Sequence, residues 1–221
     1  MIILRILTEY RAAIASGLLV TLEMCLFVWV IGIVAGVILG VVAASYKKEA
    51  GGPLRAISFL LGAVPVLVLL FWLHYPLQEL LHVVINPFYT AVFALTIINT
   101  FGVMDIVRNA LADFPKQYVL AARVCGLSAR DTVREIQLPI ISRQILPSVL
   151  TLQVNMLQLT LFASLISVEE IFRVAQRINS FVYRPVEVYS TLAIFFILIC
   201  LPLNMLASHL KKKYTRDYSE S

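Results

Sequence analysis

The chain has 221 residues, of which 60% are hydrophobic and 14% are charged, and its formal net charge is +5. Ordinary soluble domains are about 45–50% apolar and about 25% charged, so this composition excludes a soluble globular protein. The positive charge does not indicate a nucleic acid partner. The basic residues lie between and after the apolar runs, and they form no continuous polar domain.

Five apolar runs are each long enough to cross about 30 Å of hydrocarbon as a helix. They predict an all-α, polytopic membrane protein with five transmembrane helices, organised as a single domain over residues 1–221. Pro65 in the second run and Pro202 in the fifth are compatible with membrane helices whose neighbours satisfy the freed carbonyl. The predicted spans are residues 14–45, 57–75, 83–104, 145–168 and 188–210.

The distribution of basic residues predicts how the chain crosses the membrane. Thirteen lysines and arginines, among them Lys47 and Lys48, lie in the first loop, the third loop and the C-terminal tail, and five lie in the opposite segments. Loops rich in lysine and arginine remain in the cytoplasm. We therefore expect a periplasmic N-terminus and a cytoplasmic C-terminus.

Small residues in the first span predict a helix contact. Gly32, Gly36 and Gly40 recur every four residues, so they form a smooth stripe that a second helix can approach closely. The three cysteines show no metal-ligand or redox spacing, so we expect no metal site.

The segment between the third and fourth spans, residues 105–143, is not membrane-like. Residues 117–125 favour a helix that ends at Gly126, a residue suited to the left-handed position after a helix. Ser128 is a good N-cap for a second helix, which Pro139 is expected to end. From local chemistry alone, this basic unit suits either an interfacial hairpin on anionic lipid or a docking element for a cytoplasmic protein.

A family resemblance favours docking. Ala121 and Ala122, then Gly126, then Leu138 and Pro139 resemble the EAA loop of bacterial ABC importer permeases in spacing and in position before the penultimate span. The resemblance implies a fold like that of a type I ABC importer permease. It also implies that this loop is the element that couples the permease to a cytoplasmic ATP-binding subunit.

The chain departs from that motif at Leu120, where the family has an acidic residue. Elsewhere, residues 17–22, 64–72, 105–108 and 169–189 resemble the polar amino acid branch, in particular histidine, glutamine and arginine importers. This likeness implies a permease subunit in the bacterial inner membrane. Its partners would be ATP-binding subunits, a second permease subunit and a periplasmic solute-binding protein.

The chain contains no glycine-rich phosphate loop and no arrangement of serine, histidine and carboxylate typical of catalysis. We therefore expect a transport subunit that is not an enzyme and has no cofactor of its own. ATP and Mg²⁺ would be bound by the partner ATPase.

The fourth span is the most polar and is the best candidate for lining a translocation pathway, because hydrogen-bonding side chains are costly in hydrocarbon unless they face protein or water. Its polar residues occupy two opposite faces at 100° per residue. Either face could line the passage, and hydrogen bonding between helices is an equal alternative. One face carries Gln153, Thr160, Ser164 and Ser167, and the other carries Asn155 and Gln158.

Many amino acid permeases have an acidic residue in this span where the chain has Leu159. We therefore expect this subunit to contribute little charge recognition and to pair with a second, non-identical permease. Glu23 in the first span is the remaining acidic candidate. Two alternatives stay open: a permease for methionine or another small solute, and a secondary transporter driven by an ion gradient, which would need more buried ionisable residues.

Overall fold

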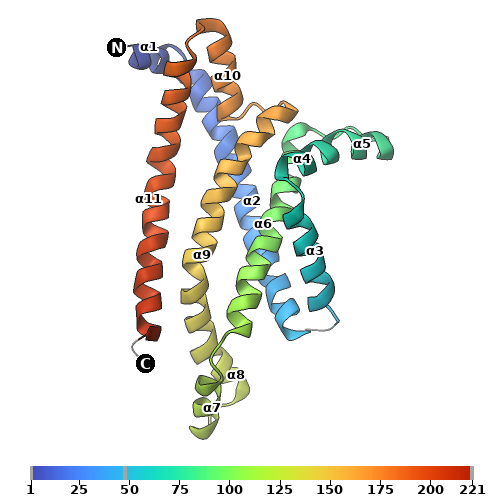
Figure 1. Ribbon diagram of the computed structural model, residues 1–221, viewed down its shortest axis with the longest axis vertical. Helices are drawn as coiled ribbons and strands as arrows, with labels where there is room; N and C mark the ends of the chain where they lie inside the picture. The colour runs from blue at the N-terminus through green and yellow to red at the C-terminus, as the bar shows by residue number, and fades with distance from the viewer. Residues whose placement is uncertain (1, 47–48, 220–221) are drawn as a thin grey trace.

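The computed structural model describes residues 2–46 and 49–219, and the described residues form helices and connecting turns without a β-strand. Four long helices run side by side along the molecule (Figure 1). They are α2 (Arg11–Ser45), α6 (Pro87–Ala112), α9 (Leu138–Leu159) and α11 (Pro185–Ser219). The shorter helices are α1 (Ile2–Glu9), α3 (Gly51–Ala63), α4 (Val66–His74), α5 (Pro76–Leu81), α7 (Lys116–Val124), α8 (Ala129–Asp131) and α10 (Ile171–Val182).

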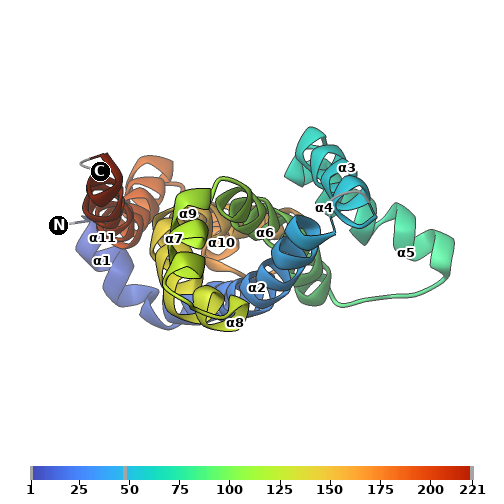
Figure 2. The ribbon, with the colours of Figure 1, turned by 90° about the horizontal axis from the view of Figure 1, so that it is seen from below.

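Length and hydropathy qualify four helices of the described chain as membrane spans, and a bent pair brings the number to five. The predicted all-α membrane architecture is therefore confirmed. Lys47 and Lys48, which the orientation prediction uses, lie outside the described residues. Seen along the long axis, α11, α9, α6 and α3 follow one another across the molecule, and α5 projects beyond α6 (Figure 2).

The second span differs from the prediction of one helix over residues 57–75. It is broken at Val64 and Pro65, and its two parts, Gly51–Ala63 and Val66–Leu81, are bent by 96°. The residue before a proline is driven out of the helical region. Val64 accordingly adopts an extended conformation, with φ −90° and ψ 123°. The prediction of one continuous helix over residues 57–75 is wrong, because the chain leaves the helical conformation at Val64 before Pro65.

The third span begins later and ends later than predicted. The Asn86 side chain caps α6 by accepting a hydrogen bond of 2.9 Å from the Phe88 N–H, and Pro87 occupies the first turn, where its missing N–H costs nothing. The helix then continues to Ala112. The first eight residues of the predicted loop 105–143 therefore belong to α6.

The prediction that Pro139 ends a helix is also wrong. The chain is helical from Ala129 to Ile166, and the turn before the proline, Thr132–Gln137, is π-helical. In that turn the Leu138 N–H donates to the Val133 carbonyl, five residues earlier. Because the ordinary ladder is already interrupted by this wider turn, Pro139 fits into the first turn of α9.

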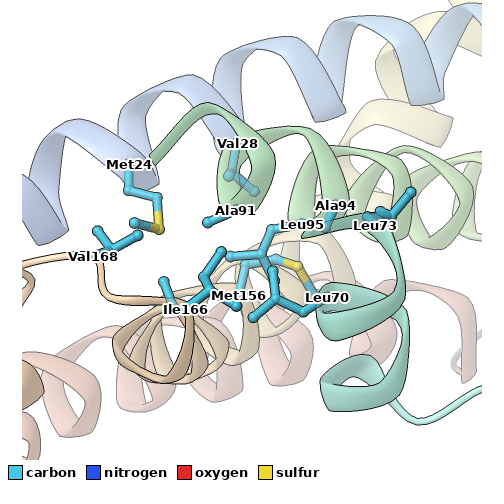
Figure 3. Close-up of a cluster of buried hydrophobic side chains, with 11 residues drawn as sticks. Met24, Val28, Leu70, Leu73, Ala91, Ala94, Leu95, Met156, Ile166 and Val168 are labelled. Carbon is cyan, nitrogen blue, oxygen red and sulfur yellow. The ribbon is translucent and has the colours of Figure 1, made fainter. Parts of the chain in front are cut away.

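A buried apolar cluster joins α2, α4, α6 and α9 near the middle of the bundle (Figure 3). Met24, Leu70, Leu95 and Met156 each come from a different helix and point toward one another in this cluster. The core therefore fixes α4 against the bundle after the bend.

The predicted glycine stripe is a real packing face between α2 and α6. A Cβ atom at Gly36 would lie 2.6 Å from the Val103 Cβ and 2.7 Å from the Thr100 carbonyl oxygen. Gly32 and Gly40 meet α6 just as closely, at Asn99 and at Val107. Side chains at these positions would force the two helices apart.

Candidate functional site

The unit that carries the predicted docking motif lies at the opposite end of the molecule from α10 (Figure 1). It consists of α7, the turn at Gly126, α8 and the π-helical turn Thr132–Gln137. We call residues 116–137 the coupling element. The last six residues of the predicted loop 105–143 lie in α9.

The turn inside the coupling element is a Schellman motif. The Leu127 N–H donates to the Ala122 carbonyl at 3.0 Å, and the Gly126 N–H donates to the Arg123 carbonyl at 3.0 Å. Gly126 has φ +79°, in the left-handed region that favours glycine. The predicted helix–glycine–helix unit is confirmed, and this turn fixes the angle between its two helices.

The second helix of the element begins as the sequence predicts. The Ser128 hydroxyl oxygen accepts a hydrogen bond of 3.2 Å from the Asp131 N–H, and Ser128 is extended, as an N-cap requires. The hydroxyl also donates to the Asp131 carboxylate. The turn is therefore rigid on both sides of Gly126.

A small apolar cluster holds the coupling element against the spans. Ala110 of α6 and Phe114 just after this helix pack with Ile141 of α9, and Tyr118 and Val119 of α7 lie against this cluster. Ala122 is buried on the same side of α7. The element is therefore packed against α6 and α9 together.

The opposite side of α7 is exposed and carries two large apolar residues among the polar Lys116, Gln117 and Arg123. Leu120 is 59% exposed and Val124 is 88% exposed. Ala121, beside them on the helix, is exposed as well. Residues four apart lie on one face of a helix, so Leu120 and Val124 form a single apolar surface. Of the predicted motif, Ala121 and Gly126 are thus accessible, Ala122 faces inward, and Leu138 and Pro139 lie at the base of α9.

The polar residues of the fourth span separate into two environments. Gln153 is buried and forms a reciprocal amide pair with Asn99 of α6, with hydrogen bonds of 2.9 and 3.0 Å. The second N–H of the Asn99 amide group donates to the Val28 carbonyl of α2 at 2.9 Å. The pair of Asn99 and Gln153 therefore joins α2, α6 and α9 inside the bundle. Gln153 does not reach the surface of the chain.

Two other predicted pathway residues on this face are also internal. The Thr160 hydroxyl donates to the Leu157 carbonyl and the Ser164 hydroxyl donates to the Leu161 carbonyl, each at 2.7 Å. Both side chains are buried. Their hydrogen bonds are satisfied by carbonyl groups three residues earlier, in the last turn of α9 and in the 3₁₀-helical turn Thr160–Ile166 that ends this span. Ser167 beyond it is exposed and has φ 70°.

The opposite face leaves its polar groups accessible. Asn155 and Gln158 are both exposed on α9, where they can meet a second subunit or a solute. Glu23 is exposed on α2 in the same way. Together with Ser167, these three are the candidate pathway residues that the isolated chain presents on its surface.

Two further buried polar residues, Asn99 and Glu170, were not predicted from the sequence. Glu170 is completely buried and caps α10, since its carboxylate accepts hydrogen bonds from the Phe172 N–H at 2.8 Å and the Arg173 N–H at 2.7 Å. Burial raises the pKa of its carboxyl to about 7, although these two hydrogen bonds act in the opposite direction. An acidic residue directly before an amphipathic helix is the signal that could have revealed this cap.

The start of α10 is fixed against α2. The Thr21 hydroxyl oxygen accepts a hydrogen bond of 3.1 Å from the Ile171 N–H, and a Cβ atom at Gly17 would lie 2.7 Å from the Val174 Cγ2. On the surface, Arg177 forms an ion pair of 2.9 Å with Glu169. The segment 168–182, which we call the α10 element, is therefore held against its own chain, although the Asn179 Oδ1 is buried without a hydrogen-bond partner among the described residues.

Residues 11–216 match the family of binding-protein-dependent transport system inner membrane components. The chain belongs to this family. The match covers all four long helices and the coupling element between them, so the family's membrane component corresponds to nearly the whole chain.

Relatives with described transport systems align over most of this family member. The octopine transport system permease protein of Rhizobium meliloti is 29% identical, over 92% of this chain and 85% of the relative. The glutamine transport system permease protein of Escherichia coli K12 is 26% identical, over 86% of this chain and 90% of the relative.

Solved structures share the fold. A crystal structure of an amino acid ABC transporter with histidines superposes with a TM-score of 0.83 at 24% identity, covering 94% of this chain and 96% of the other. An inward-facing methionine ABC transporter superposes with a TM-score of 0.72 at 16% identity, covering 93% and 98%. The predicted resemblance to ABC importer permeases is thereby confirmed for family and fold.

Proposed function

We propose that the chain is the permease subunit of an ATP-driven importer that moves a polar amino acid across the bacterial inner membrane. The exposed apolar surface of Leu120 and Val124, held by the rigid turn at Gly126, carries this proposal. Exposed apolar patches on an ordered element mark protein contacts. A cytoplasmic ATP-binding subunit is the partner that this surface fits, and it would supply the ATP and Mg²⁺ chemistry that this chain does not perform.

The substrate class follows from the relatives. Those that align with the chain are named for glutamine, octopine, and histidine with lysine, arginine and ornithine. All of these solutes carry an α-amino acid group, so a solute of that class, delivered by a periplasmic binding protein, is the proposed cargo. The methionine alternative is not favoured, because the likeness to the methionine transporter extends to the fold alone at 16% identity.

The polar residues available to the cargo are uncharged on α9. Asn155 and Gln158 are exposed amides, and Glu23 is the exposed acidic group on α2. Amides can orient an amino acid through hydrogen bonds but cannot neutralise both of its charges. We therefore propose that a second, non-identical permease completes the pathway. A purified complex that contains one kind of permease polypeptide would contradict this pairing.

Reconstitution tests the function directly. The permease, its ATPase subunits and its binding protein are incorporated into liposomes, and uptake of radiolabelled glutamine, histidine, arginine and methionine is followed with and without ATP. We expect ATP-dependent uptake of a polar amino acid and none of methionine. Uptake that persists without ATP and without the ATPase subunits would support the ion-gradient alternative instead.

A further inference from the structure

An open groove of about 970 Å³ lies between α3 and α6, toward the end of the bundle that carries the coupling element (Figure 1). None of the roles described above uses this groove. Polar and charged residues line one part of it, and apolar or small residues line the rest. Its main lining residues are Gly52, Arg55, Ser58, Phe59, Asp105 and Arg108.

The groove has more positively charged groups than negatively charged ones. Asp105 accepts a hydrogen bond from the Ser58 hydroxyl and pairs with the Arg108 guanidinium at 3.2 Å. That contact uses one Nη of Arg108, while its Nε is buried and has no hydrogen-bond partner in the described chain. Arg55 is exposed on α3 and belongs to no ion pair among the described residues. The single carboxylate is already engaged, so the groove presents an excess of cationic donors.

The first turn of α3 adds to the positive charge of the groove. The helix begins at Gly51 without a side-chain cap, and a Cβ atom at Gly52 would meet nothing within 4 Å. The N-terminal end of a helix carries a partial positive charge. In α3 the Gly51 N–H already donates to the Tyr46 carbonyl at 2.8 Å and Pro53 has no N–H, so this turn contributes chiefly through that partial charge. An anionic group in the groove would therefore meet two arginines and a helix N-terminus together.

The wall above the charges is apolar. Phe59 lies four residues after Arg55 on the same face of α3 and is 76% exposed, and Gly62 and Ala63 continue this wall up to the bend. The distance along the helix from Arg55 to Ala63 is about 12 Å at 1.5 Å per residue. A ligand that fits the groove is charged at one end and has an apolar chain at the other.

We propose that this groove binds an anionic membrane lipid, with its headgroup phosphate between Arg55 and Arg108 and an acyl chain along Phe59 and Gly62. Basic pockets between membrane helices on the cytoplasmic side recognise anionic headgroups in this way. This assignment rests on the proposed function in one respect, because it takes the side of the membrane that carries the coupling element to be the cytoplasmic side. A free amino acid fits the groove less well, because Asp105 is not available to its ammonium group.

Lipid titration of the intact transport complex tests the proposal. The complex in detergent is titrated with phosphatidylglycerol or phosphatidylcholine, and bound lipid is counted by native mass spectrometry. We expect Arg55→Gln to weaken phosphatidylglycerol binding about fivefold and to leave phosphatidylcholine binding unchanged. Arg55 has no described ion pair, so this variant should fold normally. Arg143→Gln, which removes an exposed arginine of α9 outside the groove, is the matched control and should bind as the wild type does.

A second variant separates a lipid from free phosphate. Phe59→Ala should weaken phosphatidylglycerol binding about threefold through lost apolar contact with the acyl chain. Competition by millimolar inorganic phosphate, with no effect of Phe59→Ala, would assign the groove to free phosphate and overturn the lipid assignment. Equal binding by Arg55→Gln and Arg143→Gln would overturn the site altogether.

The lipid measurement requires no transport, so it stands apart from the proposed function. A complex that fails to import amino acids can still show the Arg55-dependent lipid site. Conversely, ATP-dependent uptake with no Arg55-dependent lipid binding would remove the groove proposal and leave the importer proposal intact.

Discussion

The α10 element and the coupling element are both short helical segments between spans, at opposite ends of the molecule, yet they differ in where their contacts go. The α10 element buries Glu170 and packs Ile171, Val174 and Ile178 against its own chain. The coupling element buries Ala122 in α7 and exposes Leu120 and Val124. The first packs mainly within the subunit, whereas the second leaves an apolar surface exposed. Changes in the first should cost stability, and changes in the second should cost transport.

The largest effect is expected where α10 meets α2. Gly17→Leu should destabilise the protein by about 3 kcal/mol, because a Cβ atom there already lies 3.2 Å from the Ile171 Cα and α10 must move away. Thermal unfolding in detergent measures the loss. Gly62→Leu is the control, since a Cβ atom at Gly62 has open space around it. Equal unfolding temperatures for the two variants would contradict the close packing of α10.

The next effect concerns pH. Burial raises the pKa of Glu170 to about 7 from an ordinary value of 4.5, so the folded chain holds this proton more tightly than the unfolded chain. Stability should therefore be greatest below pH 4.5, fall as the pH rises to 7, and then stay level. The difference is at most about 3 kcal/mol.

Unfolding temperatures at pH 5 and pH 8 measure this difference. Glu170→Gln removes the titrating group and should flatten the profile between these two values. A variant that keeps the wild-type pH dependence would show that another group is responsible.

A smaller effect is expected at the coupling element, where the measured quantity is ATP-dependent uptake and not stability. Val124→Asp should reduce ATP-dependent uptake about tenfold, because it places a charge in an apolar contact with the ATPase. Its unfolding temperature should match that of the wild type, since Val124 is exposed in the isolated chain. Val124→Ile preserves the apolar contact and should transport normally. A Val124→Asp protein that lost stability but kept its uptake would contradict this distinction between the two elements.

The smallest effect is expected at the turn. Gly126→Ala should open the coupling element locally by about 1 kcal/mol, because alanine is strained at φ +79°. Trypsin cleavage at the exposed Arg123 and Arg130 should become about fivefold faster. Gly126→Asn tolerates the left-handed conformation better and should be cleaved at nearly the wild-type rate. Identical rates for all three proteins would show that this turn does not set the element's rigidity.

The parts of the fold that local chemistry determines were predictable from the sequence. The left-handed glycine, the Ser128 cap and the glycine stripe of α2 each depend on a few adjacent or regularly spaced residues. The two errors about where a helix breaks both concern prolines. A proline can bend a helix, as Pro65 does, or follow a π-helical turn, as Pro139 does, and the surrounding hydrogen-bond register decides between these outcomes.

The candidate site was predicted less completely, because its polar partners are distant in the sequence. Gln153 was identified as a polar residue of the fourth span, but its partner Asn99 is 54 residues away. Composition cannot distinguish a side chain paired with another helix from one that lines a passage. Asn155 differs from Gln153 in the direction it faces, and only the packing of α9 against α6 reveals which side is internal.

The continuous helical stretch that begins inside the coupling element has a mechanical consequence. From Ala129 to Ile166 the chain forms one helical rod of 38 residues, about 57 Å long at 1.5 Å per residue. A lever of that length magnifies small rotations, so a tilt of about 5° at the Ala129 end displaces the Ile166 end by about 5 Å. A displacement of that size is comparable to one helical turn, and it requires no residue along the rod to change its rotamer.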